Sequence, residues 1–227
     1  MPVEVVPAEV AHVLRDVARL GPYFEIRTEL DGPAAAWRPF AGDAERLRAL
    51  TGDYARRLGT GEPRVAGSLV FQGLAARLWS PVVAAAAAGI VPDLGGLRWR
   101  WAPGDSIRVG LAEPRGWAVQ GLAEAAALVH RVVVDGQLRP LWEALADGAR
   151  LADGLVWGNA ASALAGSLNV GPADPGRGAL VRALLAREPL AGAGSFGADG
   201  FVRNSCCLYY RVPGGGMCGD CGLLTKS

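Results

Sequence analysis

Residues 68–89 have the sequence SLVFQGLAARLWSPVVAAAAAG. The stretch predicts helix, but Ser80 followed by Pro81 is typical of an N-cap and the first position of a new helix. We therefore expect two helical pieces with a break or kink at Ser80. The longest apolar run, residues 81–92, is Ala-rich and too short to cross the hydrocarbon core of a membrane. The sequence accordingly predicts no transmembrane segment.

Helical patterns continue on both sides of this stretch. Val10, Val13, Leu14 and Val17 repeat at helical spacing, and Gly21-Pro22 ends that pattern. Further helices are expected over residues 43–58, over 120–168 with an interruption near 135–136, and over 178–187. The body of the protein should therefore be mostly helical.

A hairpin is predicted in the middle of the chain. Residues 97–101, LRWRW, alternate apolar and basic side chains, residues 103–105 supply a turn, and residues 107–111 alternate again. Residues 24–30 indicate one more short extended segment. The predicted fold class is mostly helical α+β, in which a helical body holds a small antiparallel sheet and is followed by a Cys-rich tail from about Gly200.

Length and composition exclude several classes of protein. A chain of 227 residues with a net charge of +1 can bury one sizeable core but offers no large basic face, so no nucleic-acid partner is expected. The N-terminal MPVEVVPAEV lacks the basic start and apolar stretch of a signal peptide, which predicts a cytoplasmic protein. No long coiled-coil pattern occurs, which favours a monomer.

All four cysteines lie in the last 22 residues, spaced C-C-x10-C-x2-C. They are Cys206, Cys207, Cys218 and Cys221. A C-x-x-C turn brings two thiolates onto one metal ion or cluster. The intervening LYYRVPGGGM has three glycines, which let the backbone approach an inorganic core. Arg203 and Arg211 flank the cysteines and could offset the negative charge of four thiolates.

Several kinds of site could use these cysteines. A structural zinc site usually has two C-x-x-C-like turns, and adjacent cysteines fit a tetrahedron poorly. Disulfides are disfavoured in a chain without a secretion signal. A thioredoxin-type redox site needs a helix after its C-x-x-C, but only six residues follow Cys221. A [2Fe–2S] cluster, which usually takes four thiolates, is favoured, while zinc and disulfides stay open.

The tail resembles a known family. Residues 203–221, RNSCCLYYRVPGGGMCGDC, are similar to the C-terminal motif of FhuF-type ferric siderophore reductases, and all four cysteine positions match. Residues 68–94 and 155–170 also resemble the body of such proteins. The resemblance suggests three parts: an N-terminal helical region (1–62), an FhuF-like body (63–199) and a [2Fe–2S]-binding segment (200–227).

The resemblance implies an enzyme that reduces iron(III) held by a hydroxamate-type siderophore in the cytoplasm. Iron(II) binds hard oxygen ligands more weakly than iron(III), so one electron lets the metal leave the chelate. The G-x-G-x-x-G of residues 192–197 follows a helix and precedes the Cys tail, so it predicts a loop and no nucleotide site. The electron donor should therefore be a separate, unknown molecule.

Other functions remain open at this point. The chain could be a non-enzymatic iron–sulfur protein for electron transfer or for redox or iron sensing, or a structural four-cysteine zinc protein. The sequence does not place the substrate pocket. Tryptophans usually pack in cores, and a less favoured interpretation places Trp79, Trp99 or Trp101 against the chelate.

Overall fold

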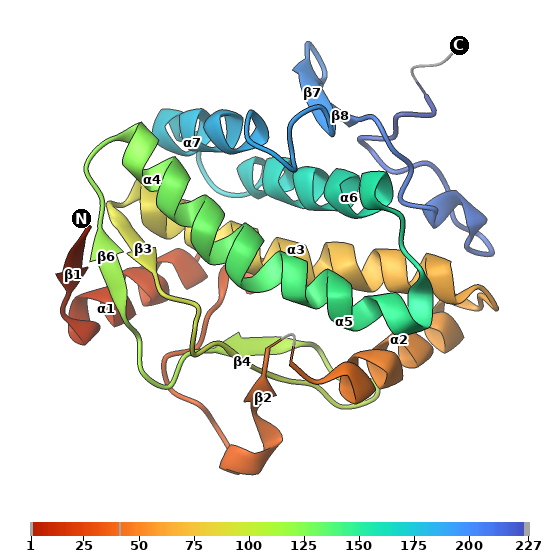
Figure 1. Ribbon diagram of the computed structural model, residues 1–227, viewed down its shortest axis with the longest axis horizontal. Coiled ribbons are helices and arrows are strands. Elements are labelled where there is room, and N and C mark those ends of the chain that lie inside the picture. Colours follow the sequence, from red (N-terminus) through yellow and green to blue (C-terminus); the bar gives the residue numbers. More distant parts are fainter. Residues whose placement is uncertain (1, 41, 225–227) are drawn as a thin grey trace.

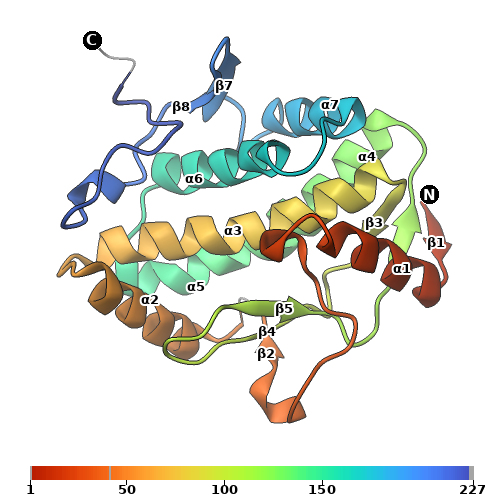
Figure 2. The same ribbon diagram turned by 180° about the vertical axis from the view of Figure 1, so that it is seen from behind.

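The computed structural model describes residues 2–40 and 42–224 (Figure 1). It is 52% helical, with small antiparallel sheets and the cysteines gathered near the C-terminus, which confirms the predicted fold class. Two views show the helices grouped around one long central helix, α3, with the C-terminal tail on the same side of it as α6 (Figures 1 and 2).

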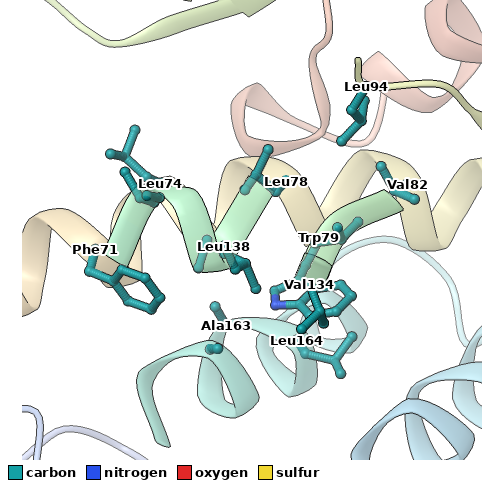
Figure 3. Packing of buried hydrophobic residues seen from close by; sticks show 14 of the residues in the cluster. Phe71, Leu74, Leu78, Trp79, Val82, Leu94, Val134, Leu138, Ala163 and Leu164 are labelled. Atoms are coloured by element: carbon teal, nitrogen blue, oxygen red, sulfur yellow. The ribbon is translucent and has the colours of Figure 1, made fainter. Parts of the chain in front are cut away.

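Helix α3 (Pro63–Ala87) is continuous through Pro81, so of the predicted break or kink at Ser80 the break is wrong, and no second helix begins there. An interior proline costs a helix about 3 kcal/mol because it removes a hydrogen bond and crowds the preceding turn. Burial outweighs this cost, since every residue from Leu78 to Ala86 is buried and each large apolar side chain contributes about 1.5–3 kcal/mol when buried. Figure 3 shows Trp79 of α3 packed near Val134 and Leu164.

The helices around α3 follow the predicted pattern in most places. Their bounds are α1 Pro7–Ala18, α2 Ala44–Leu58, α4 Leu122–Val129, α5 Arg139–Ala149, α6 Asp153–Gly166 and α7 Pro175–Leu185. Helix α2 begins as expected, because the Asp43 carboxylate accepts a hydrogen bond from the Arg46 backbone N–H at 3.0 Å. Short 3-10 helices occupy Pro22–Phe24, Ala34–Ala36, Ser167–Asn169 and Tyr209–Arg211.

The helix is not interrupted near residues 135–136 as predicted, but its hydrogen-bonding pattern changes there. A π-helical segment, His130–Leu138, joins α4 to α5 without a break. The chain instead leaves the helix at Arg150, whose left-handed φ of 43° ends α5 before α6 begins. The sequence pattern missed this second position because Arg150 is not a residue type that favours the left-handed region.

The predicted hairpin is present as β4 (Arg98–Arg100) and β5 (Arg108–Gly110), with Trp99 opposite Val109. Strand β2 (Arg38–Pro39) extends this sheet on the β4 side. A second sheet has the order β1-β6-β3, formed by Val3–Val5, Gly116–Ala118 and Ile90–Pro92. The expected extended segment at 24–30 is reduced to one bridge between Arg27 and Gly110.

The chain then forms a hairpin of β7 (Gly194–Gly197) and β8 (Gly200–Arg203) before the cysteines. The predicted loop at 192–197 is therefore partly wrong, because these residues enter a strand. A strand follows the motif in place of the helix that the dinucleotide-binding pattern requires.

Helix α3 is long and apolar enough to cross a membrane on length and hydropathy alone. However, 72% of its most apolar 18-residue window is buried inside the protein. In this fold α3 therefore serves as the central core helix.

Candidate metal centre

Buried hydrogen bonds hold the cysteine segment, residues 203–222, against α3 and α6. The Ser68 hydroxyl of α3 donates to the carbonyl oxygen of Cys207 at 2.7 Å. The Asn159 amide of α6 donates to the Ser68 hydroxyl at 2.8 Å and to its carbonyl oxygen at 3.0 Å. Because Ser68 and Asn159 are fully buried, the main chain at Cys207 is held by groups with no access to water.

The second fastening is Arg203, which is only 1% exposed although it carries a charge. Its guanidinium makes two hydrogen bonds to the Asp220 carboxylate, from Nε at 2.9 Å and from a terminal nitrogen at 2.7 Å. It also donates to Asn159 Oδ1 at 2.7 Å and to the Ser162 hydroxyl. One buried side chain thus joins the strand before Cys206 to the turn between Cys218 and Cys221, and both to α6.

Two glycines allow close contacts of the cysteine segment, Gly158 with α6 and Gly222 within the segment itself. A Cβ at Gly158 of α6 would overlap the Ser205 hydroxyl oxygen, and one at Gly222 would overlap the Arg203 carbonyl oxygen. The backbone oxygen cannot rotate away, so a side chain at Gly222 would push the cysteine segment apart. At Gly158 the Ser205 hydroxyl can rotate, and its Cβ at 3.2 Å then has to give only slightly. The close approach therefore requires glycine at position 222 and favours it at position 158.

The two halves of the cysteine motif meet at Cys207 and Cys218. Their Sγ atoms lie 3.7 Å apart, well beyond the length of about 2.05 Å of a disulfide, and all four cysteines are free. Cys207 and Cys221 are buried, whereas Cys206 and Cys218 are half-buried. Each half of the motif thus offers one sheltered thiol and one that reaches toward the surface.

Charge near the thiols is balanced by Arg203. Burial raises the pKa of the Cys206 and Cys218 thiols above the ordinary value, while the positive charge of Arg203 acts in the opposite direction. Burial alone would raise the pKa of Asp220, but hydrogen bonds from Arg203 outweigh it and hold that pKa below its usual range. Asp220 and Arg203 therefore both stay ionised beside the cysteines at neutral pH.

Residues 203–222 match the family described as the FhuF 2Fe-2S C-terminal domain. The chain carries an FhuF-type iron–sulfur domain. This confirms the resemblance seen in the tail, and the [2Fe–2S] cluster is the cofactor of that domain. No curated protein and no solved structure matches the chain significantly.

The residues present fit such a cluster. A two-iron cluster takes its four thiolates as two pairs. The structure brings one cysteine of each half together, Cys207 and Cys218, and gathers no group of three His, Cys, Asp or Glu side chains among the described residues. The Ser205 hydroxyl oxygen, next to Cys206 in the chain, is buried against Gly158 and has no hydrogen-bond partner in the described part of the chain.

Sequence reasoning misplaced some of the surrounding residues. Of the two arginines expected to balance the thiolates, only Arg203 lies against the FhuF domain's cysteines, because Arg211 pairs with Glu62 at 3.0 Å on the surface. The three tryptophans proposed less favourably for the chelate are core residues: Trp79, Trp99 and Trp101 are at most 4% exposed.

Three residues whose hydrogen bonds hold the FhuF domain in place were not predicted from the sequence. They are Ser68, Asn159 and Asp220. A signal existed for Asn159, since it is the one amide in the apolar, small-residue stretch of α6. Ser68 and Asp220 gave no such signal, because serine near a helix start and aspartate in a turn are ordinary in those positions.

Gly222→Ala is expected to destabilise the FhuF domain, whereas Gly219→Ala in the same turn is not. A Cβ at Gly222 meets a backbone oxygen that cannot rotate away, while a Cβ at Gly219 has no heavy atom within 4 Å. We expect Gly222→Ala to cost about 1–3 kcal/mol of unfolding free energy and to lower the iron content of the purified protein. Thermal unfolding and iron analysis measure both, and equal behaviour of the two variants would contradict the packing described here.

Proposed function

We propose that this protein is a ferric siderophore reductase, which reduces iron(III) in a hydroxamate-type siderophore in the cytoplasm and so releases iron(II). The observation that carries the proposal is the FhuF 2Fe-2S domain at residues 203–222, docked against the helical body. When bound, a [2Fe–2S] cluster supplies one electron at a time, which is what the conversion of iron(III) to iron(II) requires.

The cluster ligands in this proposal are Cys206, Cys207, Cys218 and Cys221. The buried Cys207 and Cys221 would anchor the site, while the half-buried Cys206 and Cys218 would keep one side of it near solvent. Electron exchange with a bulky chelate needs this accessibility. Arg203 supplies a fixed positive charge close to Cys207 and Cys218, and it stays in place because Asp220 and α6 hold it.

The iron chelate is the substrate, and its release follows from its own chemistry. Hydroxamate oxygens are hard ligands that hold iron(III) far more tightly than iron(II). The protein therefore needs no side-chain acid, base or nucleophile for the electron transfer itself. The FhuF domain has to hold the redox centre, shelter it and bring it near the chelate.

The electron donor is proposed to be a separate molecule, and the protein to act as a monomer without a membrane span. The G-x-G-x-x-G motif lies in the β7–β8 hairpin and does not form a dinucleotide site. The four free cysteines suit a reducing compartment, which supports the cytoplasm as the location. Cell fractionation tests the location, and size-exclusion chromatography with light scattering tests the monomer.

A direct assay tests the reductase proposal. Protein purified without oxygen should be red-brown and bleach with dithionite. After excess dithionite is removed, adding a ferric tris-hydroxamate should restore the oxidised spectrum and produce iron(II) that a ferrous-specific chelator traps. A protein that binds the cluster but is reoxidised by no ferric siderophore would instead be an electron carrier or sensor. A colourless protein with stoichiometric zinc would overturn both interpretations.

A further inference from the structure

A pocket of about 660 Å³ opens beside the FhuF domain. Its walls come from α3, the C-terminal end of α6, the β7–β8 hairpin and the turn at Gly219–Asp220. This volume lies within the range of about 300–1,000 Å³ that small-molecule sites occupy. It is large enough to take a substantial part of an iron chelate.

The pocket reaches the cysteine motif itself. Gly219 and Asp220, the two residues between Cys218 and Cys221, form part of its wall. Two other pockets on the described surface contain no residue of the FhuF domain. A molecule bound in the first pocket would therefore contact the C-x-x-C turn through Gly219 and Asp220, the neighbours of Cys218 and Cys221 in the chain.

Aromatic rings line two sides of the pocket. Phe196 and Phe201 of the hairpin pack edge to face with centroids 5.4 Å apart, and Tyr23 and Phe24 contribute from the 3-10 helix after α1. Arg182 lies over the Phe196 ring, which helps to fix its orientation. The rings provide flat apolar surface for the hydrocarbon backbone of a chelator.

A second arginine, Arg77, lies over the Tyr23 ring with its Cζ 4.4 Å from the centroid. Its guanidinium also donates to the Gly73 and Ile107 carbonyl oxygens, and that of Arg182 donates to the Gly178 carbonyl oxygen. Both cations are thus engaged with main chain and ring, and neither is among the residues lining the pocket.

The polar groups of the pocket are neutral or acidic. Gln72 and Asn169 supply amides, Ser80 and Ser162 supply hydroxyls, and Gln72 donates to Ser162 at 3.1 Å. The ionisable lining residues are Tyr23, Asp199 and Asp220, of which Asp220 is paired with Arg203. The described lining residues include no lysine or arginine, so the pocket offers no counter-charge for a strongly anionic ligand.

This chemistry selects between classes of iron chelate. Three singly charged hydroxamates neutralise iron(III), whereas three doubly charged catecholates leave the complex a trianion. Amides and hydroxyls can hydrogen-bond a neutral chelate, and aromatic rings can pack against it. A trianion would have to lose its hydration beside the Asp199 carboxylate, with no lysine or arginine among the described lining residues, which is costly.

We infer that this pocket is the binding site for a neutral or cationic ferric tris-hydroxamate, with the Gly219–Asp220 turn as its contact to the redox centre. The inference rests on the proposed reductase function with its hydroxamate-type substrate, and adds the place where that substrate binds. A [2Fe–2S] cluster held by the cysteines would supply the single electron that turns iron(III) into iron(II), and the external donor would replace that electron. The freed hydroxamates then take protons from water.

Filling the pocket tests this placement. Gly166 lines the pocket at the end of α6, and no heavy atom lies within 4 Å of a Cβ built there, so Gly166→Trp places a large ring in open space. Gly154→Trp is the matched control, because Gly154 is exposed near the start of the same helix and lies outside the pocket lining. Gly73→Leu, on the α3 wall, is a second filling variant should Gly166→Trp not fold.

The first readout is binding without reaction. The gallium(III) complex of desferrioxamine B has the shape and charge of the ferric complex but does not accept the electron. Titration calorimetry on the holoprotein should show at least about tenfold weaker binding for Gly166→Trp than for wild type, with Gly154→Trp unchanged. Binding of a gallium(III) tris-catecholate to wild type should be weaker than that of the hydroxamate by at least about tenfold.

The second readout separates this inference from the proposed function. Reduced Gly166→Trp should be reoxidised normally by ferricyanide but slowly by the ferric tris-hydroxamate. If wild type is reoxidised by ferric hydroxamates and both filling variants behave like it, the chelate binds elsewhere and the inference is wrong. Equal or tighter binding of the tris-catecholate would overturn the charge class. If wild type reacts with no ferric chelate, the reductase proposal itself fails.

Discussion

Serine in place of any one of the four cysteines is expected to remove the iron–sulfur absorption and the ferric reductase activity together. The variants are Cys206→Ser, Cys207→Ser, Cys218→Ser and Cys221→Ser. A hydroxyl is a far poorer ligand than a thiolate for iron in such a cluster, and changes outside the ligand shell already cost about 10–100-fold in metal affinity. We therefore expect activity to fall at least about 100-fold.

The measurement is iron and sulfide content per chain, with visible absorption, after anaerobic purification. Met217→Leu is the matched control, since it removes an exposed sulfur from the same loop, 3.6 Å from Cys221 Sγ, without removing a thiol. That variant should keep the full iron content. A cysteine variant that retained two irons per chain and the wild-type spectrum would show that the replaced residue is not a ligand.

Local chemistry made several elements predictable from sequence. Helix α2 has both end signals, Asp43 as its N-cap and Gly59 with a left-handed φ of 65° after its last turn. The β4–β5 hairpin follows from alternation and from Gly104, whose φ of 86° suits a turn. The match to the FhuF 2Fe-2S domain was predictable because all four cysteines fall within 16 residues. In each case the deciding interactions are close in sequence.

Features that depend on distant residues were not predictable. Helix α3 passes through Pro81 because burial by the surrounding helices outweighs a local breaker, and no local pattern reports that burial. The polar network under the cysteines is similar, since Ser68 and Cys207 are 139 residues apart, and Asn159 and Arg203 are 44 apart. The pocket walls come from separate elements too, so the aromatic residues that line it could not be told from ordinary core residues.

Arg203→Gln is expected to lower the stability of the protein by about 3–5 kcal/mol. The change leaves the Asp220 carboxylate, whose side chain is 20% exposed, without its two charged hydrogen bonds, and it leaves Asn159 Oδ1 without a donor. Removing one partner of a buried pair is costly because the other keeps its charge without water. For a protein of this size the thermal midpoint should fall on the order of 10 °C.

Arg211→Gln is the control variant. It removes the same charge from the same segment and also breaks a contact between that segment and the helical body. Its ion pair with Glu62 is 44% exposed on both sides, so breaking it should cost less than about 1 kcal/mol. Thermal unfolding of the anaerobic holoprotein and of the iron-free protein measures both variants. If Arg203→Gln and Arg211→Gln lowered the unfolding free energy equally, the buried hydrogen-bond network would not be what holds the cysteine segment in place.

A companion variant, Asp220→Asn, separates the structural role of the pair from its electrostatic role. Both single variants break the same contact, so both should destabilise the fold, and the double variant should lose less than the sum of the two. Their effects on the reduction potential should be opposite in sign. Loss of the Arg203 cation leaves a carboxylate near the thiolates and disfavours the added electron, whereas loss of the Asp220 anion leaves a cation there and favours it. Redox titration of the two holoproteins measures this, and shifts in the same direction would show that the pair acts on the cysteines through structure alone.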